Sequence, residues 1–338
     1  MKSFARAGVD PFFLGPRSLF LMQSEPTLSD IRAALELIGP HIHRTPVMTS
    51  STLDREFGAK LFFKCENFQK VGAFKARGAT FAVLSALDGD VRSGVLTHSS
   101  GNHAAALARA AAIRGVPGYI VMPNNAPKVK QESVRRYGGQ ITFCEPTTPA
   151  REAAAAKVHA ETGALLVHPY DNWSVITGQG TCALELLEEI IDLDLLLTPV
   201  GGGGLLSGST IAAKALRPSI RVFGTEPAGA DDAFRSLQTG VRQPQNNPQT
   251  IADGLRSSLG DKSFSVLSRM VDGVVTVSEE AIVTAMRKTW EVLKIIIEPS
   301  CAVPLAALLE HKLDVEGKRV GIILTGGNVD LDRLPWQH

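Results

Sequence analysis

The sequence has almost no net charge and no long apolar run. Its 338 residues include 35 Lys and Arg against 34 Asp and Glu, a formal charge of +1 at pH 7. A chain without a basic excess has no strong electrostatic attraction to nucleic acid or to an anionic membrane surface. No apolar run reaches the roughly 20 residues that a helix needs to cross a bilayer. We therefore expect neither nucleic acid nor a membrane as a partner.

Cysteine is scarce and scattered. Cys65, Cys144, Cys182 and Cys301 are far apart, and no two of them form a CxxC pair. Disulfide frameworks and zinc sites usually show regular, close cysteine spacing. We therefore expect free thiols in a reducing, cytoplasmic compartment. Residues 1–23 lack the apolar region and the cleavage site of a secretory signal, and we expect a flexible N-terminal tail.

From residue 27 onward, short apolar strands alternate with helical patterns. Strands are expected at residues 60–64, 94–97, 118–122, 140–144, 165–167, 195–200, 220–224 and 319–324, and helices at residues 27–38, 102–114, 127–137, 149–162, 205–216 and 279–293. Such alternation indicates βαβ units, hence an α/β fold of parallel sheets with helices on both faces. We predict a large domain from residues 24–93 and 171–338, with a small α/β domain, residues 94–170, inserted into it.

One lysine stands in a run of small residues. Residues 72–78 read GAFKARG, a loop-like run with Lys75 near its centre. A lysine that performs covalent chemistry must lose its proton, and partial burial lowers its pKa. Small neighbours would also let a flat cofactor approach the amine. Taken alone, the run is more typical of a solvated loop lysine, so the other motifs decide its meaning.

Four consecutive glycines, residues 201–204, lie between a buried strand and a helix. They would expose backbone N–H groups at a helix N-terminus, which suits a phosphate. The alternatives are a tight turn and a dinucleotide site, since the run is also a partial GxGxxG with Ser207 as its third position. Glu226 is the nearest match to the acidic residue that a dinucleotide site requires.

Two further polar loops precede a helix and follow a strand. Residues 99–103 read SSGNH, and their hydroxyl, amide and N–H groups could hold a carboxylate or simply cap the helix. His103 fits a structural role better than a catalytic one. Residues 325–328 read TGGN after the last strand, at the sheet edge where open α/β folds bind ligands. An ordinary turn is the alternative there.

The order of these motifs resembles that of the fold-type-II pyridoxal-phosphate enzymes, the tryptophan synthase β-like group. HP at 168–169, GQGT at 178–181 and TIADG at 250–254 extend the similarity over residues 27–332. The chain looks like the serine racemase and serine/threonine (hydroxyaspartate) dehydratase family. This implies an ammonia-lyase that converts a β-hydroxy-α-amino acid (serine, threonine or 3-hydroxyaspartate) to a 2-keto acid and ammonia. An amino-acid racemase is the alternative within the family, and we expect a homodimer.

The resemblance also implies roles for individual residues. Lys75 would carry the cofactor as a Schiff base, and Ser100 would match the second catalytic base of racemases. The implied cofactor contacts are Phe74 near the ring, Asn102 at the 3-hydroxyl, Thr325 at the pyridine nitrogen, and Gly201, Gly202, Gly203, Gly204 and Leu205 at the phosphate. The substrate carboxylate would bind to Ser99, Ser100, Gly101, Asn102 and His103. Glu226, the Ala230 carbonyl and Asp232 would bind Mg²⁺ or Ca²⁺ through hard oxygen donors.

Three positions bear on the substrate and on regulation. Tyr170 replaces the asparagine of the racemase motif His-Pro-Asn and favours a dehydratase, while VGA at 71–73 replaces Thr-Gly-Ser and puts nucleotide activation in doubt. Arg151 opens a predicted helix, where a cation opposes the helix dipole. It could be retained to bind a second substrate carboxylate, or pair with Glu152 on the surface. Outside the family, a dinucleotide-dependent oxidoreductase and a non-catalytic binding module stay open.

Overall fold

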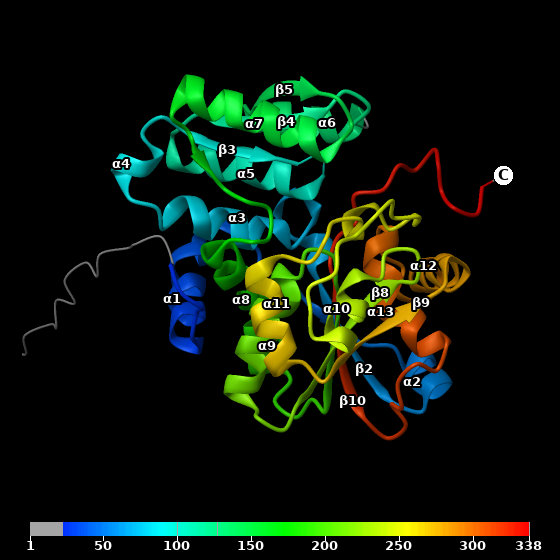
Figure 1. Cartoon of the computed structure of the whole chain (residues 1–338). Coiled ribbons are helices and arrows are strands. Elements are labelled where there is room, and N and C mark those ends of the chain that lie inside the picture. The colour runs from blue at the N-terminus through cyan, green and yellow to red at the C-terminus, as the bar shows by residue number, and fades with distance from the viewer. Residues whose placement is uncertain (1–22, 100, 127, 338) are drawn as a thin grey trace, which may run out of the picture.

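Two parallel sheets organise the molecule, and each is covered by helices (Figure 1). The computed structural model describes residues 23–99, 101–126 and 128–337. The larger sheet has the strand order β1-β2-β10-β7-β8-β9 and the smaller one β5-β4-β3-β6. Every pair is parallel except β1 with β2. The predicted α/β class with parallel sheets is therefore confirmed.

The chain enters the larger sheet, leaves it for the smaller one, and then returns. The larger sheet contains β1 Val47–Met48, β2 Lys60–Cys65, β7 Leu195–Pro199, β8 Arg221–Pro227, β9 Gly273–Val277 and β10 Arg319–Leu324. The smaller sheet contains β3 Val95–His98, β4 Gly118–Pro123, β5 Gln140–Cys144 and β6 Leu165–Leu166. The predicted domain limits at residues 94 and 170 stay a prediction. The predicted N-terminal tail falls almost wholly outside the described residues.

The α-helices of the described chain fall into two consecutive groups. Those before and within the smaller sheet are α1 Leu28–Ile38, α2 Ser51–Phe57, α3 Lys75–Leu84, α4 Asp88–Val91, α5 Asn102–Arg114, α6 Lys128–Arg136 and α7 Thr148–Thr162. Those after it are α8 Trp173–Glu189, α9 Gly204–Leu216, α10 Asp232–Thr239, α11 Asp261–Met270, α12 Glu279–Leu293 and α13 Pro299–Leu309. Short 3-10 turns are η1 Gly39–His41, η2 Glu66–Phe68, η3 Lys70–Gly72 and η4 Asp253–Leu255. None of the described helices is long and apolar enough to cross a membrane.

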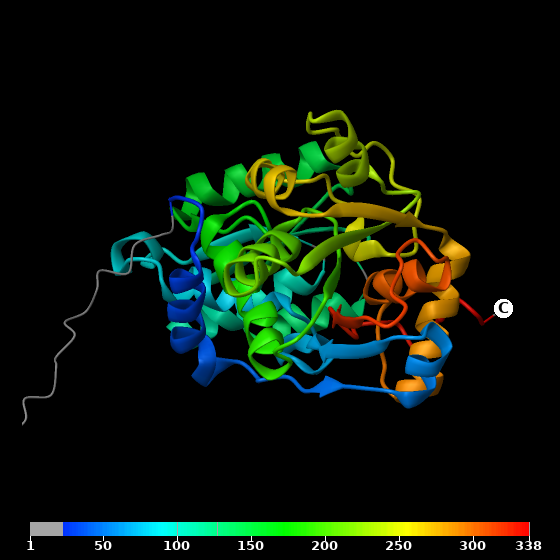
Figure 2. The same cartoon turned by 90° about the horizontal axis from the view of Figure 1, so that it is seen from below.

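The larger sheet is buried on both faces, as its continuous apolar strands require. Leu195 and Leu197 of β7 belong to a core cluster with α12 and α13, whereas Leu196 belongs to a second cluster with α8, α9 and α11. Successive side chains of a strand point to opposite faces, so the two clusters lie on opposite sides of the sheet. Figure 2 shows the orange α12 and α13 on one side and the green α8 and α9 on the other.

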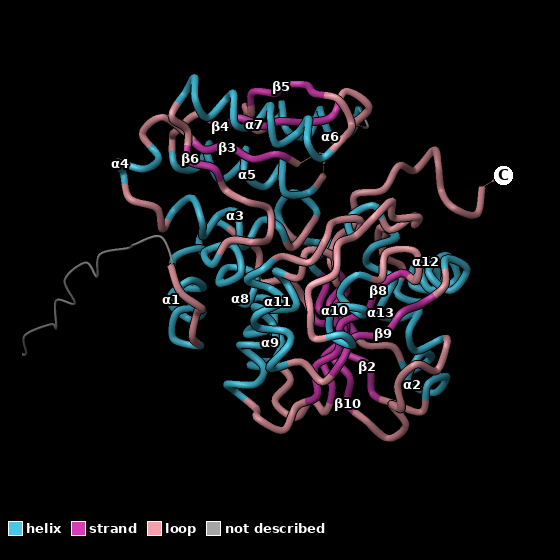
Figure 3. Tube along the Cα trace, in the orientation of Figure 1, coloured by secondary structure: helices cyan, strands magenta, loops and turns pink. Residues whose placement is uncertain are grey.

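Helix α5 lies between the smaller sheet and α3 (Figure 3). Its alanines are buried with Ile120 and Met122 of β4 on one side, and α3 packs against it on the other. Alanine lets helices and sheets approach closely because it has no side chain beyond Cβ. The starts of α3 and α5, which carry Lys75 and Asn102, are thereby held between the two sheets.

One structural prediction for the central lysine is wrong. The run at residues 72–78 is not a loop at Lys75, because α3 begins with that residue. Helix α8 was also missed, and glycines explain both errors. A Cβ atom at Gly78 would lie 2.7 Å from the Val175 carbonyl of α8, and one at Gly180 would lie 2.8 Å from the Gly208 carbonyl of α9. These glycines allow close helix packing, although in a sequence they are typical of loops.

Candidate active site

The amine of Lys75 lies half-buried at the start of α3. Its Nζ atom donates a hydrogen bond to the Pro169 carbonyl at 2.9 Å and lies 5.1 Å from the centroid of the Phe74 ring. Burial lowers the pKa of Lys75 to about 8. The unprotonated form, which attacks a carbonyl group, is therefore far more populated near neutral pH than it is for an ordinary lysine.

The end of β10 lies against the residues that precede α3. The Phe74 N–H donates to the Thr325 carbonyl at 3.0 Å, and Ala73 forms an isolated antiparallel bridge with Gly326. Thr325 is buried directly after the last strand. The structure thus brings Phe74, Lys75 and Thr325 together at the carboxyl edge of the larger sheet.

Asn102, the first residue of α5, connects the helix beside the smaller sheet to this edge. Its Nδ2 atom donates to Glu298 at 2.8 Å, and its Oδ1 atom accepts from the Asn328 amide at 2.9 Å. Burial and the nearby charge of Asp253 raise the pKa of Glu298 to about 7, although Lys130 opposes the shift. Glu298 was not predicted as a site residue, because no motif surrounds this glutamate in the sequence.

The four glycines form a tight, buried loop between β7 and α9. Gly203 has φ +85° and is the N-cap of α9, so no side chain caps this helix. A Cβ atom at Gly202 would lie 2.2 Å from the Tyr170 ring, and one at Gly203 would lie 2.6 Å from Ser263. Within the described chain, the buried hydroxyls of Ser207 and Ser263 have no hydrogen-bond partner. Uncapped N–H groups and orphaned hydroxyls fit a phosphate group.

Three rings connect this loop to the smaller sheet. The Tyr170 ring lies edge-on to His168 at 4.6 Å between centroids, and His168 lies edge-on to His98 at 5.5 Å. Burial and the proximity of His98 lower the pKa of His168 to about 4. Its Nδ1 atom accepts from the Asp171 N–H at 2.9 Å, so the neutral ring carries its proton on Nε2.

Arg151 lies in the first turn of α7, and its positive charge influences the pKa values of His98 and Tyr170. Burial lowers the pKa of His98, and the positive charge of Arg151 lowers it further. The same charge acts on Tyr170, whose pKa is raised chiefly by burial. The structure therefore places Arg151 within electrostatic reach of His98 and Tyr170.

The SSGNH loop is described in part. Ser99 accepts from the Gly101 N–H at 3.3 Å, and a Cβ atom at Gly101 would lie 4.0 Å from the Lys130 amine. His103 is buried, and its pKa lies well below the usual range, mainly because of burial and then because of Lys75. Ser100 lies outside the described residues.

Two buried carboxylates form a separate cluster at the start of α10. Glu226 accepts from the N–H groups of Ala233 and Phe234 at 3.1 and 2.8 Å, and Asp232 Oδ2 accepts from the Leu259 N–H at 2.6 Å. Burial raises the pKa of both acids, that of Asp232 to about 6. Asp232 Oδ1 is buried without a partner in the described structure. Two such acids with an unfilled oxygen suit a hard cation.

The donor set of this cluster is small. Within residues 23–99, 101–126 and 128–337, no group of three or more His, Cys, Asp and Glu side chains is placed to hold a metal. A cation here would need the main-chain carbonyl of Ala230 beside Glu226 and Asp232. The same geometry argues against a dinucleotide site, because Glu226 is directed to the start of α10 instead of to a ribose.

The fold, the buried lysine at the start of α3 and the glycine loop together fit an enzyme that holds a phosphorylated cofactor on a lysine. The sequence matches the family described as "Pyridoxal-phosphate dependent enzyme" over residues 38–326. The chain therefore belongs to the pyridoxal-phosphate-dependent enzymes. The residues around Lys75 and the glycine loop fit this cofactor.

Similar proteins of known activity indicate the part of this family that the chain resembles. A β-hydroxyaspartate dehydratase of Paracoccus denitrificans (strain Pd 1222) is 52% identical over 311 residues, covering 92% of this chain and 99% of that protein. A serine racemase of Arabidopsis thaliana is 51% identical and covers 90% of this chain and 93% of that protein. The solved structure of maize serine racemase has a TM-score of 0.89 at 48% identity, covering 91% of this chain and 95% of that one. The predicted resemblance to racemases and hydroxy-amino-acid dehydratases is confirmed.

Proposed function

We propose that this protein is an ammonia-lyase that converts a β-hydroxy-α-amino acid to a 2-keto acid and ammonia, with 3-hydroxyaspartate as its main substrate. The observation that carries the proposal is the half-buried amine of Lys75, whose pKa is lowered to about 8 beside the carboxyl edge of the larger sheet. The 52% identity to a β-hydroxyaspartate dehydratase supports the choice of substrate. Serine and threonine are the other substrates to be compared.

The residues around Lys75 divide the chemical work. When bound, pyridoxal phosphate withdraws electrons from the substrate Cα and so makes its proton removable. We propose that Lys75 holds the cofactor covalently and, once released, takes this proton on Nζ. The neutral hydroxyl of Thr325 beside the ring nitrogen would not impose a full positive charge there. This favours rapid loss of the β-hydroxyl group.

The remaining contacts bind and orient. We propose that Gly201, Gly202, Gly203, Gly204 and Leu205 receive the phosphate, that Phe74 packs near the ring, and that Asn102 binds the ring hydroxyl. The substrate carboxylate would lie against Ser99, Ser100, Gly101, Asn102 and His103. Arg151, near His98 and Tyr170, would bind the second carboxylate of 3-hydroxyaspartate as a two-point pair. Such a contact would be absent with serine.

Three broader proposals accompany this function. A divalent cation, Mg²⁺ or Ca²⁺, would bind at Glu226, Asp232 and the Ala230 carbonyl as a structural ion. All four cysteines are free, which supports a reducing, cytoplasmic compartment. We also propose a homodimer, which sedimentation of the purified protein would test.

An absorption spectrum and a keto-acid assay test the proposal together. The purified protein should be yellow, and borohydride reduction followed by peptide mapping should leave the cofactor on Lys75. The assay should then detect a 2-keto acid from 3-hydroxyaspartate faster than from serine or threonine. Lys75→Ala should abolish product formation.

Two results would overturn the proposal. Cofactor mapped to a different lysine would remove its chemical basis. Faster appearance of the opposite enantiomer than of keto acid would make the protein a racemase, with Ser100 as its second base.

A further inference from the structure

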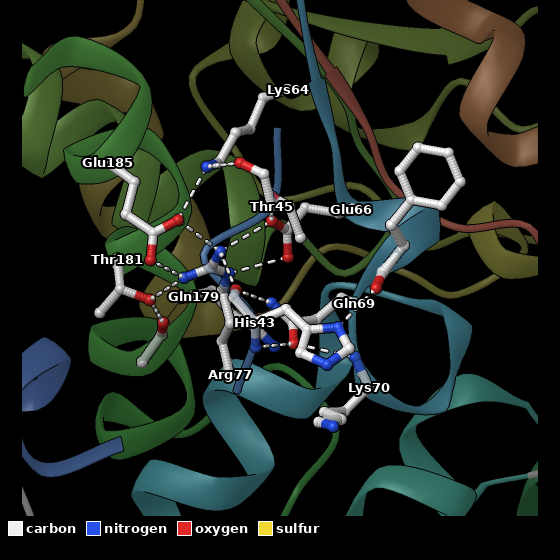
Figure 4. Close-up of polar contacts among 12 residues, drawn as sticks. His43, Thr45, Lys64, Glu66, Gln69, Lys70, Arg77, Gln179, Thr181 and Glu185 are labelled. Carbon is white, nitrogen blue, oxygen red and sulfur yellow. Dashed lines mark hydrogen bonds and ion pairs between the residues drawn. The ribbon is translucent and has the colours of Figure 1, made fainter. Parts of the chain in front are cut away.

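Four charged side chains form a buried network beside the first turn of α3 (Figure 4). They are Lys64 of β2, Glu66 of η2, Arg77 of α3 and Glu185 of α8, and none of these side chains is more than 2% exposed. The two positive and two negative charges balance. The mechanism proposed above uses none of them.

Arg77 is the centre of this network. Its Nε and Nη2 atoms donate to the two oxygens of Glu66, both at 2.8 Å. Its Nη1 and Nη2 atoms donate to the two oxygens of Glu185 at 3.0 and 2.8 Å. Lys64 donates to Glu185 at 2.7 Å and to the Thr45 carbonyl at 2.7 Å. Only a planar guanidinium can make both two-point pairs at once.

Stability alone is a weak reason for such a network. Replacing a buried ion cluster by well-packed apolar side chains is often neutral or stabilising. Arg77 also lies in the first turn of α3, where a cation is unfavourable to the helix dipole. Phe74, the N-cap of this helix, makes no side-chain capping bond. The helix that carries Lys75 is therefore anchored by Arg77 instead of by a cap.

We propose that Arg77 is a positioning residue for Lys75, fixing the first turn of α3 between η2 and α8 so that the amine stays in the active site. Lys75 is two residues before Arg77, and its Nζ atom reaches the Pro169 carbonyl. A shift of this turn would displace the amine and admit water to it. The inference rests on the proposed covalent role of Lys75.

Arg77 would act on Lys75 through position and not through its charge, because burial accounts for the lowered pKa of Lys75. Among the described residues, His103 of α5 and His168 of the segment before α8 interact electrostatically with Lys75. Burial lowers the pKa of both histidines, so both are neutral at pH 7. If the first turn moves and water enters, the pKa of the amine should rise toward its ordinary value.

Arg77→Lys tests the proposal, because it keeps the charge but loses the planar fork. Lys64→Met is the matched control, since it removes a cation from the same network without touching α3. Both variants should lower the melting temperature of the holoenzyme. In Arg77→Lys alone, hydroxylamine should release the cofactor about tenfold faster, because small misplacements of reacting groups have large effects on rate. The visible circular dichroism of the bound cofactor should fall in the same variant.

The outcomes separate this inference from the proposed function. Cofactor on a lysine other than Lys75 would overturn the proposed function itself. Cofactor on Lys75, with equal hydroxylamine rates and equal dichroism in the two variants, would leave that function intact and overturn the positioning role. Should Arg77→Lys fail to fold, Glu66→Gln loosens one of the two pairs and is expected to change both readouts in the same direction. An unchanged signal in Glu66→Gln would also overturn the inference.

Discussion

At the scale of single residues, burial shifts the ionisable groups around the site toward their neutral forms. It lowers the pKa of Lys75 to about 8 and that of His168 to about 4, and it raises the pKa of Glu298 to about 7. The unprotonated fraction of the Lys75 amine can act as nucleophile and base, and the neutral imidazole of His168 adds no charge that would compete for an anionic substrate. The positive charge of Arg151 therefore acts on the rings of His98 and Tyr170, which carry little charge of their own.

Glu298 makes the stability of the protein depend on pH. Its folded pKa of about 7 lies above the ordinary carboxyl value, so the folded state binds this proton more tightly than the unfolded chain. That contribution is complete below about pH 4, which is near the unfolded pKa, and is lost as pH rises through 7. Glu298→Gln resembles the protonated form and can still accept from Asn102. We expect the variant to gain about 1–3 kcal/mol relative to the parent between pH 5 and pH 8.

Denaturant unfolding of both holoenzymes at the two pH values checks this expectation. The quantity to compare is the difference between the free energies of unfolding of the variant and the parent. Asp253→Asn, which removes the neighbouring negative charge, should lower the pKa of Glu298 and reduce the effect. A difference that is the same at pH 5 and pH 8 would show that Glu298 does not titrate in this range.

At the scale of elements, the sequence predicted those whose contacts follow local patterns. Helix α12 and strand β10 have the predicted limits, because an N-cap serine with acidic first-turn residues and a continuous apolar run mark them directly. The start of α3 was missed because glycines flank it in the sequence and because its anchor is Arg77 and not a capping side chain. The partners of Arg77 and Asn102 are 108 and 196 residues away, at Glu185 and Glu298. Isolated charges of this kind look like surface residues in a sequence.

The start of α10 should respond to divalent cations. Glu226 and Asp232 are both buried at 0% exposure, and a bound cation would neutralise them. An ion present at 100 times its dissociation constant would stabilise the fold by about 2.7 kcal/mol. We therefore expect a chelator to lower the melting temperature by several degrees and excess Mg²⁺ to restore it.

Variants show whether that response arises at this cluster. Asp232→Asn should reduce the difference between chelator and Mg²⁺, whereas Asp231→Asn, at the neighbouring carboxylate that pairs with Arg235, should keep it. Equal melting temperatures of the parent in chelator and in Mg²⁺ would contradict a cation at this point. The activity assay run in parallel would show whether the ion has more than a structural role.

At the scale of the whole molecule, the proposed site draws on residues associated with both sheets. Lys75, Thr325 and the glycine loop adjoin the larger sheet, whereas Asn102 and Arg151 adjoin the smaller one. The two parts are also joined by an ion pair between Lys130 of α6 and Asp253 of η4. A substrate with two carboxylates would therefore be held from both sides, with Arg151 deciding whether the second carboxylate is recognised.

Arg151→Ala tests this arrangement through substrate preference. Removing the guanidinium should raise the KM for 3-hydroxyaspartate by a factor that corresponds to about 1.5–3 kcal/mol, the range for hydrogen bonds to charged groups. The KM for serine should change little, because serine has no second carboxylate. Arg151→Lys keeps the charge without the planar fork, and its KM for 3-hydroxyaspartate should lie between those of the parent and of Arg151→Ala. Glu152→Gln, on the same turn of α7, is the matched control and should leave the preference unchanged. If Arg151→Ala raises both KM values equally, Arg151 supports the fold of α7, and another residue must select the substrate.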